Sequence, residues 1–183
     1  KVYAEAGNAP VVTYNNCTFN ALSVNKTAVE IDCTNQTSGT PYYVTIINPT
    51  IKNMGAAEHY AVGAAGVCNL ETSGVGLGIV NVDGKAYSVA HTAAQLEALT
   101  NAGKDVTIQF AQDIEGDFTY EQNENETVVI DGNGMTMNGT INVRARADRA
   151  IPVVIKNINF QTTDAERSFI LSSETNRYPH ITV

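Results

Sequence analysis

Acidic side chains that could act as a catalytic pair are few in this sequence. A glycoside hydrolase requires two carboxyl groups roughly 5 to 10 Å apart. Asp131 lies beside a repeated motif, and Asp148 and Asp164 lie in the loops expected after it. Asp131 directly precedes "GNG", and aspartate is a frequent turn former because its side chain binds nearby backbone amides. The sequence therefore favours Asp131 as a turn residue and assigns no catalytic residue.

A short basic cluster follows at Arg144, Arg146 and Arg149. In "INVRARADRA", Arg144 and Arg146 are two residues apart, so on a β-strand both side chains lie on one face, which we expect to be solvent-exposed. This face could contact an anionic glycan or a neighbouring subunit. The net charge of −8 disfavours nucleic acid as a partner, because phosphate binding requires clustered lysines and arginines.

Several tyrosines are candidate platforms on which sugar rings could stack, because their side chains combine an apolar ring with a polar tip. They are Tyr42, Tyr43, Tyr60, Tyr120 and Tyr178. Tyrosine is also common at ordinary strand edges, so both interpretations remain open. We predict Tyr120, together with Arg144 and Arg146, as ligand-binding residues.

The sequence contains no pattern for a metal ion or a cofactor, and we predict neither. The histidines are scattered, at His59, His91 and His180, and no HExxH, paired CxxC or EF-hand loop occurs. "GVGLG" (residues 74–78) precedes an expected strand instead of opening a helix, so it is not a phosphate loop. The cysteines are Cys17, Cys33 and Cys68. An odd number cannot close a disulfide framework, so we expect small buried side chains and leave a Cys17–Cys33 bridge open.

The elements that would position these residues are indicated by a repeated segment. "VTYNNCTF" (residues 12–19), "VTIINPTI" (44–51) and "VVIKNINF" (153–160) each begin with alternating apolar residues, which is typical of a β-strand. The fifth residue is asparagine, at Asn16, Asn48 and Asn157, and the alternation then resumes in shifted phase. Asparagine tolerates the left-handed conformation, so each segment is predicted to be two strand arms joined by a bend. In "VVIDGNGM" (residues 128–135), Gly132 takes this position.

The spacing of the strand starts indicates stacked repeats. Val106, Val128, Val153 and Ile181 begin similar apolar stretches, with steps of 22, 25 and 28 residues between them. Val12 and Val44 are separated by 32 residues, which allows one repeat with an inserted loop. Periods of 20 to 50 residues are typical of solenoids, in which each turn buries its apolar face against its neighbours.

These motifs resemble the right-handed parallel β-helix, or pectate-lyase-like, fold. Residues 113–141, "DIEGDFTYEQNENETVVIDGNGMTMNGTI", are similar to the opening coils of β-helix modules in surface and secreted proteins of gut Bacteroidetes and their phages. The resemblance implies an all-β solenoid in which asparagines stack as a ladder, here Asn16, Asn48, Gly132 and Asn157. Enzymes of this fold are mainly polysaccharide lyases and glycoside hydrolases. A lyase would need a basic residue and, usually, Ca²⁺ held by acids, and Arg144, Arg146 and Arg149 are the only basic candidates.

One short helix is predicted near residues 92–102, with Thr92 as its N-cap, Gln95 completing a capping box and Gly103 ending it. The resemblance implies that this helix caps the first coil. A hairpin is predicted at Asp83-Gly84. The domain prediction is β-helix coils in 1–70, a Gly-rich junction and hairpin in 71–88, and a helix-capped β-helix start in 89–183.

These patterns lead to a prediction of function. We expect a non-enzymatic extracellular β-solenoid module with a structural or adhesive role, on a cell or virion surface, which either assembles end to end or forms part of a longer repeat array. The alternatives are a β-helix polysaccharide lyase or glycoside hydrolase, and a glycan-binding module. The expected partners are a second copy or a glycan or cell-surface ligand. No membrane insertion is expected, because no apolar stretch reaches about 18 residues. The chain begins at Lys1, and we interpret it as a processed or excised piece.

Overall fold

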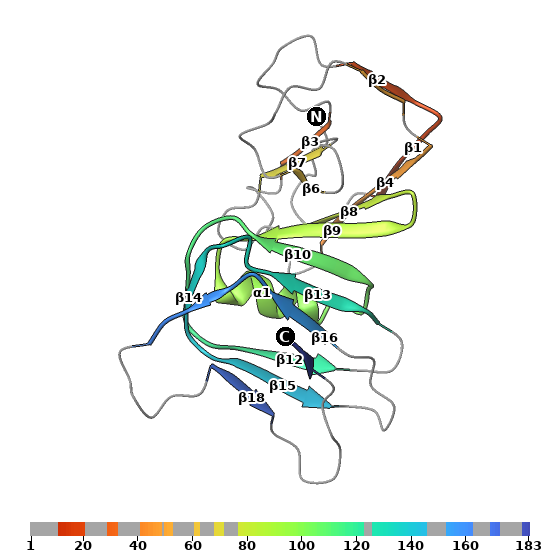
Figure 1. Ribbon diagram of the computed structural model, residues 1–183. Coiled ribbons are helices and arrows are strands. Elements are labelled where there is room, and N and C mark those ends of the chain that lie inside the picture. Colours follow the sequence, from red (N-terminus) through yellow and green to blue (C-terminus); the bar gives the residue numbers. More distant parts are fainter. Residues whose placement is uncertain are drawn as a thin grey trace. The chain divides into compact units, whose positions relative to one another are not determined.

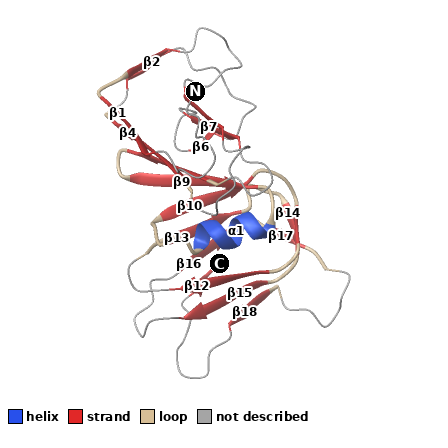
Figure 2. Ribbon diagram, turned by 180° about the vertical axis from the view of Figure 1, so that it is seen from behind, coloured by secondary structure: helices blue, strands red, loops and turns tan. Residues whose placement is uncertain are grey.

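The computed structural model describes residues 11–20, 29–32, 41–48, 50–52, 61–62, 68–71, 77–122, 126–145, 153–162, 169–172 and 181–183. Within these ranges the chain is mostly β-structure with sheets of parallel strands and one helix (Figures 1 and 2). It divides into two compact units, Lys1–Val89 and Ala90–Val183.

The second unit contains three groups of parallel strands. The first group is β10 (Val106–Phe110), β13 (Val128–Asp131), β16 (Val153–Lys156) and β19 (Ile181–Thr182). The second is β11 (Ile114–Glu115), β14 (Thr136–Asn138) and β17 (Asn159–Phe160). The third is β12 (Phe118–Gln122), β15 (Ile141–Ala145) and β18 (Ile170–Ser172). Each of these strands up to β16 therefore pairs with the strand three places later in the chain, as Figure 1 shows for β12, β15 and β18.

The register of the first group is the one predicted from the spacing of the repeats. Val106 pairs with Val128, Val153 pairs with Ile181, and Val129 pairs with Val154. The predicted steps of 22, 25 and 28 residues are therefore confirmed as strand pairings. The chain between paired strands varies in length, while the strands themselves keep one parallel register.

The core of the second unit follows from alternation along each strand. In β10 the burial alternates so that Val106, Ile108 and Phe110 point inward. In β12 the same alternation buries Phe118, Tyr120 and Gln122. Burying an apolar side chain of this size stabilises the folded state by roughly 1.5 to 3 kcal/mol, so stacked rows of such residues hold the strand groups together.

The first unit also contains parallel pairs. β1 (Val11–Asn15) pairs with β4 (Tyr42–Ile47), and β4 pairs with β8 (Gly78–Val82). β2 (Thr18–Asn20) pairs with β5 (Thr50–Lys52), and β3 (Val29–Asp32) pairs with β7 (Cys68–Glu71). β6 (Ala61–Val62) adds an antiparallel partner to β7. The predicted alignment of Val12 with Val44 is confirmed by the β1–β4 register.

The predicted hairpin joins β8 to β9 (Lys85–Ala90). Asp83 and Gly84 both have positive φ, 48° and 85°, as a two-residue turn of this type requires. β8 lies in the segment predicted as a junction, residues 71–88. Because β8 pairs along its length with β4 and Val80 is fully buried, part of this segment belongs to the sheet of the first unit.

The one helix in the described part of the chain, α1 (Ala93–Thr100), lies within the predicted range. Thr92 is the N-cap, and its hydroxyl accepts a hydrogen bond from the Gln95 amide at 3.1 Å. The Gln95 side chain accepts one from the His91 amide at 2.7 Å, one residue before the position that a capping box would use. Gly103 has the expected positive φ of 69°, but the helix ends earlier, with Asn101 as its C-cap.

The bends at the repeated asparagines have the predicted backbone conformation. Asn16, Asn48 and Asn157 have φ of 54°, 48° and 55°. The predicted left-handed conformation of Gly132 is wrong, because the positive φ lies instead at Asn133, with φ of 54°. A Cβ at Gly132 would lie 2.5 Å from the carbonyl oxygen of Asn157. Gly132 is thus required by close approach of the neighbouring chain and not by left-handed geometry.

Candidate functional site

Asp131, the acid closest to a motif, is occupied by structural contacts. Its carboxylate accepts hydrogen bonds from the Asn133 amide and from Nδ2 of Asn157, each at 3.0 Å. The other carboxylate oxygen forms an ion pair with Lys156 Nζ at 3.2 Å. The turn contact to Asn133 is the one predicted from the sequence. Asp148 and Asp164 lie outside the described residues.

These contacts also set the charge of Asp131. Burial is the largest influence and opposes ionisation of the carboxyl group. The hydrogen bonds from Asn157 and Asn133 and the positive charge of Lys156 together outweigh burial, so the pKa of Asp131 lies below its usual value of 3.8. The side chain is therefore a carboxylate at neutral pH and acts as a hydrogen-bond acceptor at the end of β13.

Arg144 is exposed on β15, as predicted. Its guanidinium lies 3.6 Å from the carboxylate of Glu121, which is the residue paired with it on β12. The side chain remains 44% exposed, so the ion pair leaves part of the guanidinium open to solvent. Arg146 and Arg149 lie outside the described residues. The ligand-binding role of Arg144 and Arg146 stays a prediction.

Tyr120 does not offer its ring to a ligand, and the predicted stacking role is wrong. It points to the same side of β12 as Phe118 and is 0% exposed. Its hydroxyl has no hydrogen-bond partner within the described residues. Burial, with a smaller contribution from the charge of Glu126, raises the pKa of Tyr120 to about 12. Tyr42 is also buried, Tyr43 is half-buried, and Tyr60 and Tyr178 lie outside the described residues.

Ladder residues form hydrogen bonds between successive repeats in both units. Asn48 Nδ2 donates to Asn16 Oδ1 at 2.8 Å in the first unit. Asn157 Nδ2 donates to Asp131 Oδ1 at 3.0 Å in the second unit. The side chain that bonds to Asn157 from the preceding repeat is thus that of Asp131, and not Gly132 as predicted. In both cases the later residue in the chain donates and the earlier one accepts, so the ladder has a direction.

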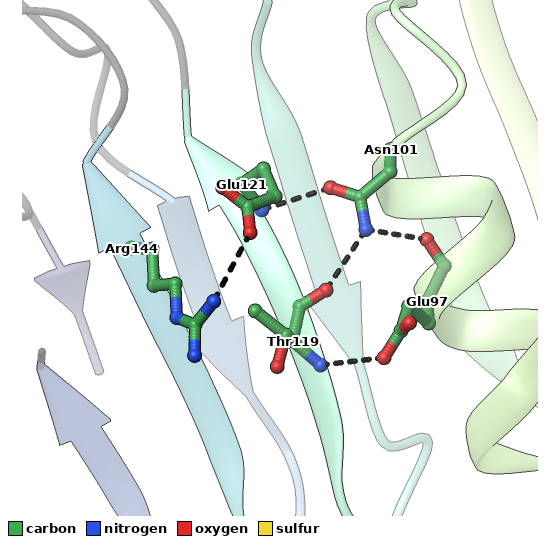
Figure 3. A network of polar contacts seen from close by, with 5 residues as sticks. All are labelled: Glu97, Asn101, Thr119, Glu121 and Arg144. Atoms are coloured by element: carbon green, nitrogen blue, oxygen red, sulfur yellow. Dashed lines mark hydrogen bonds and ion pairs between the residues drawn. The ribbon is translucent and has the colours of Figure 1, made fainter.

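The helix α1 covers the free edge of β12 with side chains instead of a strand. Asn101 Nδ2 donates to the Thr119 carbonyl, and Asn101 Oδ1 accepts from the Glu121 amide, both at 2.8 Å. Glu97 accepts from the Thr119 amide at 2.9 Å. Figure 3 shows these contacts, with Arg144 continuing them on the far side of β12. Backbone groups that would otherwise be available to another strand are thereby satisfied.

A set of aspartate–threonine contacts was not foreseen from the sequence. Each joins a carboxylate just before a strand to the amide of a threonine in the next repeat, at 2.6 to 2.7 Å. The pairs are Asp105 with Thr127, Asp113 with Thr136, and Asp117 with Thr140. The signal that could have revealed them is the recurrence of Asp and Thr at separations of 22 and 23 residues.

Other chemistry-bearing groups are dispersed in the described part of the chain. No group of three or more His, Cys, Asp or Glu side chains there could hold a metal ion. Cys17 is a free thiol, so it is not bridged to Cys33. None of the helices in the described ranges is long and apolar enough to cross a membrane.

Comparison with known proteins adds no relative. No protein-family model, curated protein or solved structure matches the chain. The functional argument therefore depends on the strands, the ladder and the edges of the sheets.

Proposed function

We propose that this chain is a right-handed parallel β-helix module with a structural or adhesive role outside the cell, on a cell or virion surface or in a secreted fibre. The observation that carries the proposal is that the same parallel strand pairing recurs in three sheets of the second unit, together with hydrogen bonds between side chains at the bends. β10, β11 and β12 are followed by β13, β14 and β15 in parallel register, and then by β16, β17 and β18. Such stacking buries apolar rows and adds repeats without changing the cross-section.

The direction of the ladder and the covering of one edge favour assembly in one direction. In the second unit, α1 satisfies the edge of β12, whereas β17 and β18 are the last strands of their sheets in the described part of the chain. Unsatisfied strand edges are templates for further strands. A second unit that is covered at β12 and open at β17 and β18 extends a rod by accepting another repeat at β17 and β18.

The glycan-binding and enzymatic alternatives have less support in the described residues. Asp131 is held by two hydrogen bonds and an ion pair, and Tyr120 is buried. Arg144 is the one predicted ligand-binding residue that lies exposed in the described ranges, and it is paired with Glu121. A rod that presents loops and ends to partners requires none of these groups to converge.

The test is the mass of the protein in solution over a concentration series, by multi-angle light scattering, with electron microscopy of the same samples. We expect particles whose mass and length increase with concentration and whose width stays constant. A monomer at every concentration would remove the end-to-end assembly. Binding on a glycan array or cleavage of acidic polysaccharides by that monomer would then favour one of the alternatives.

A further inference from the structure

The outer edge of β1 is incompletely covered. β1 is the last strand of its sheet in the described part of the chain and pairs only with β4. Val12 and Tyr14 lie opposite Val44 and Ile46, which are 1% and 0% exposed. Val12 and Tyr14 themselves are only half-buried. One more parallel strand along β1 would bury this apolar pair as β1 buries the pair on β4.

The ladder at β1 ends in an unused donor. Asn16 Oδ1 accepts from Asn48, but Asn16 Nδ2 has no hydrogen-bond partner within the described ranges. Asn157 is in the opposite state, because its Nδ2 donates to Asp131 while its Oδ1 accepts no hydrogen bond there. Both asparagines are exposed and both have positive φ. The donor left at Asn16 is therefore complementary to the acceptor left at Asn157.

The strands around these two asparagines have the same pattern. Residues 12–19 and 153–160 share apolar residues before the asparagine and an aromatic residue three places after it, at Phe19 and Phe160. β17 is the last strand of its sheet in the described part of the chain. Within the described residues, β16 pairs on its outer side with β19, at Val153 and Val154.

We propose that β1 and β2 of one copy dock in parallel on β16 and β17 of a second copy, with Asn16 Nδ2 donating to Asn157 Oδ1. β19 yields its two pairings to β1, which extends over five residues. The contact continues the direction seen in the Asn48–Asn16 and Asn157–Asp131 rungs. This inference rests on the proposed end-to-end assembly and names the two surfaces that meet.

A cross-link tests the register of this contact. Cys17 is a free thiol, and in the proposed register it lies beside Ile158 of the second copy. Neighbouring strands are about 4.8 Å apart, within the Cα separation that a disulfide spans. We expect Ile158→Cys to form a disulfide with Cys17 under mild oxidation. Mass spectrometry of mixed light and isotope-labelled protein identifies the link as intermolecular.

Two controls make the cross-link specific. Adding Cys17→Ser to Ile158→Cys should abolish the linked peptide. Asn159→Cys, one residue further along with its side chain on the other face of the strand, should link several-fold less. Equal linking from Asn159→Cys, or no link to Cys17 in samples that do form long particles, would overturn the inference and leave the proposed function intact.

A second variant tests the ladder without adding a thiol. Asn16→Asp keeps the Oδ1 acceptor for Asn48, removes the outward donor and adds a negative charge, so that residue 16 resembles Asp131, which accepts from Asn157 in the second unit. We expect self-association to weaken roughly 10- to 100-fold, because the Asn157 acceptor of the second copy would face another acceptor. Asn15→Asp adds the same charge at the neighbouring exposed position and should weaken association far less. Equal effects of the two variants would contradict the ladder contact, and absence of association in the unaltered protein would defeat both proposals.

Discussion

At the scale of single residues, Asp131 shows how a carboxylate can stabilise a turn. It accepts from the Asn133 amide within its own turn and from Asn157 of the next repeat, and it pairs with Lys156. An asparagine at this position would preserve the acceptor oxygen and the shape but lose the negative charge. The charge, and with it the pairing to Lys156, is the part of the site that a change of pH can probe.

The first prediction concerns this pH dependence. The pKa of Asp131 is lowered in the folded state, so its carboxylate contributes stability above the unfolded value of 3.8, and this contribution is lost as the pH falls through the folded pKa. Asp131→Asn should therefore lower the free energy of unfolding by roughly 1 kcal/mol at neutral pH. The difference from the unaltered protein should shrink as the pH falls below 3.8. Urea unfolding at a series of pH values measures it, and a pH-independent difference would contradict the assignment.

The second prediction concerns the buried hydroxyl of Tyr120. The hydroxyl is fully buried and has no hydrogen-bond partner within the described residues, so its desolvation is uncompensated. Tyr120→Phe keeps the ring in the core and should leave stability unchanged or raise it by about 1 kcal/mol. Thermal unfolding by circular dichroism gives the result. Tyr120→Ala is the matched control and should cost about 3 to 5 kcal/mol, as removal of a large aromatic side chain from a core does.

At the scale of the elements, the strands could be predicted from the sequence because their apolar residues repeat at a fixed register. Val106, Val128, Val153 and Ile181 pair as their spacing indicated. Local rules failed where the neighbouring repeat decided the conformation. Gly132 is present because the backbone of Asn157 approaches it, a contact that belongs to a residue 25 positions away in the sequence.

Prediction of the candidate site was limited for a related reason. Alternation places Tyr120 on one face of β12, but only the packing against other strands decides whether that face is core or surface. The contacts of Asp105, Asp113 and Asp117 likewise join one repeat to the next. A search for catalytic acids treats each aspartate by its own neighbourhood in the chain and so misses this role.

The third prediction tests the covering of β12 by α1. Asn101→Ala removes the hydrogen bonds to the Thr119 carbonyl and the Glu121 amide, leaves these two groups of the β12 edge without their partners, and should cost about 1 to 3 kcal/mol. Asn101→Asp retains the acceptor for the Glu121 amide, so its free energy of unfolding should lie between those of the unaltered protein and Asn101→Ala. Hydrogen exchange at the Glu121 amide reports the loss locally. Unchanged protection of that amide in Asn101→Ala would show that the helix side chains do not hold the edge.

At the scale of the whole molecule, the net charge opposes the contact that the strand edges favour. Each chain carries a net charge of −8, so two copies repel one another as they approach. The proposed contact between β1–β2 and β16–β17 uses apolar side chains, backbone groups and two neutral asparagines, none of which gains from opposite charge. Self-association by strand edges and self-association by ion pairs therefore respond to salt in opposite directions.

The fourth prediction follows from this balance. Raising the ionic strength from about 0.01 M to 0.1 M shortens the screening length from about 30 Å to about 10 Å, which removes most of the repulsion between two acidic chains. We expect the association constant to increase several-fold over this range while Asn16→Asp remains weaker than Asn15→Asp at each salt concentration. Sedimentation equilibrium measures both. A decrease of the association constant with salt would mean that ion pairs, such as one made by Arg144 with a neighbouring copy, hold the assembly together. The contact between Asn16 and Asn157 would then not be the cause of self-association.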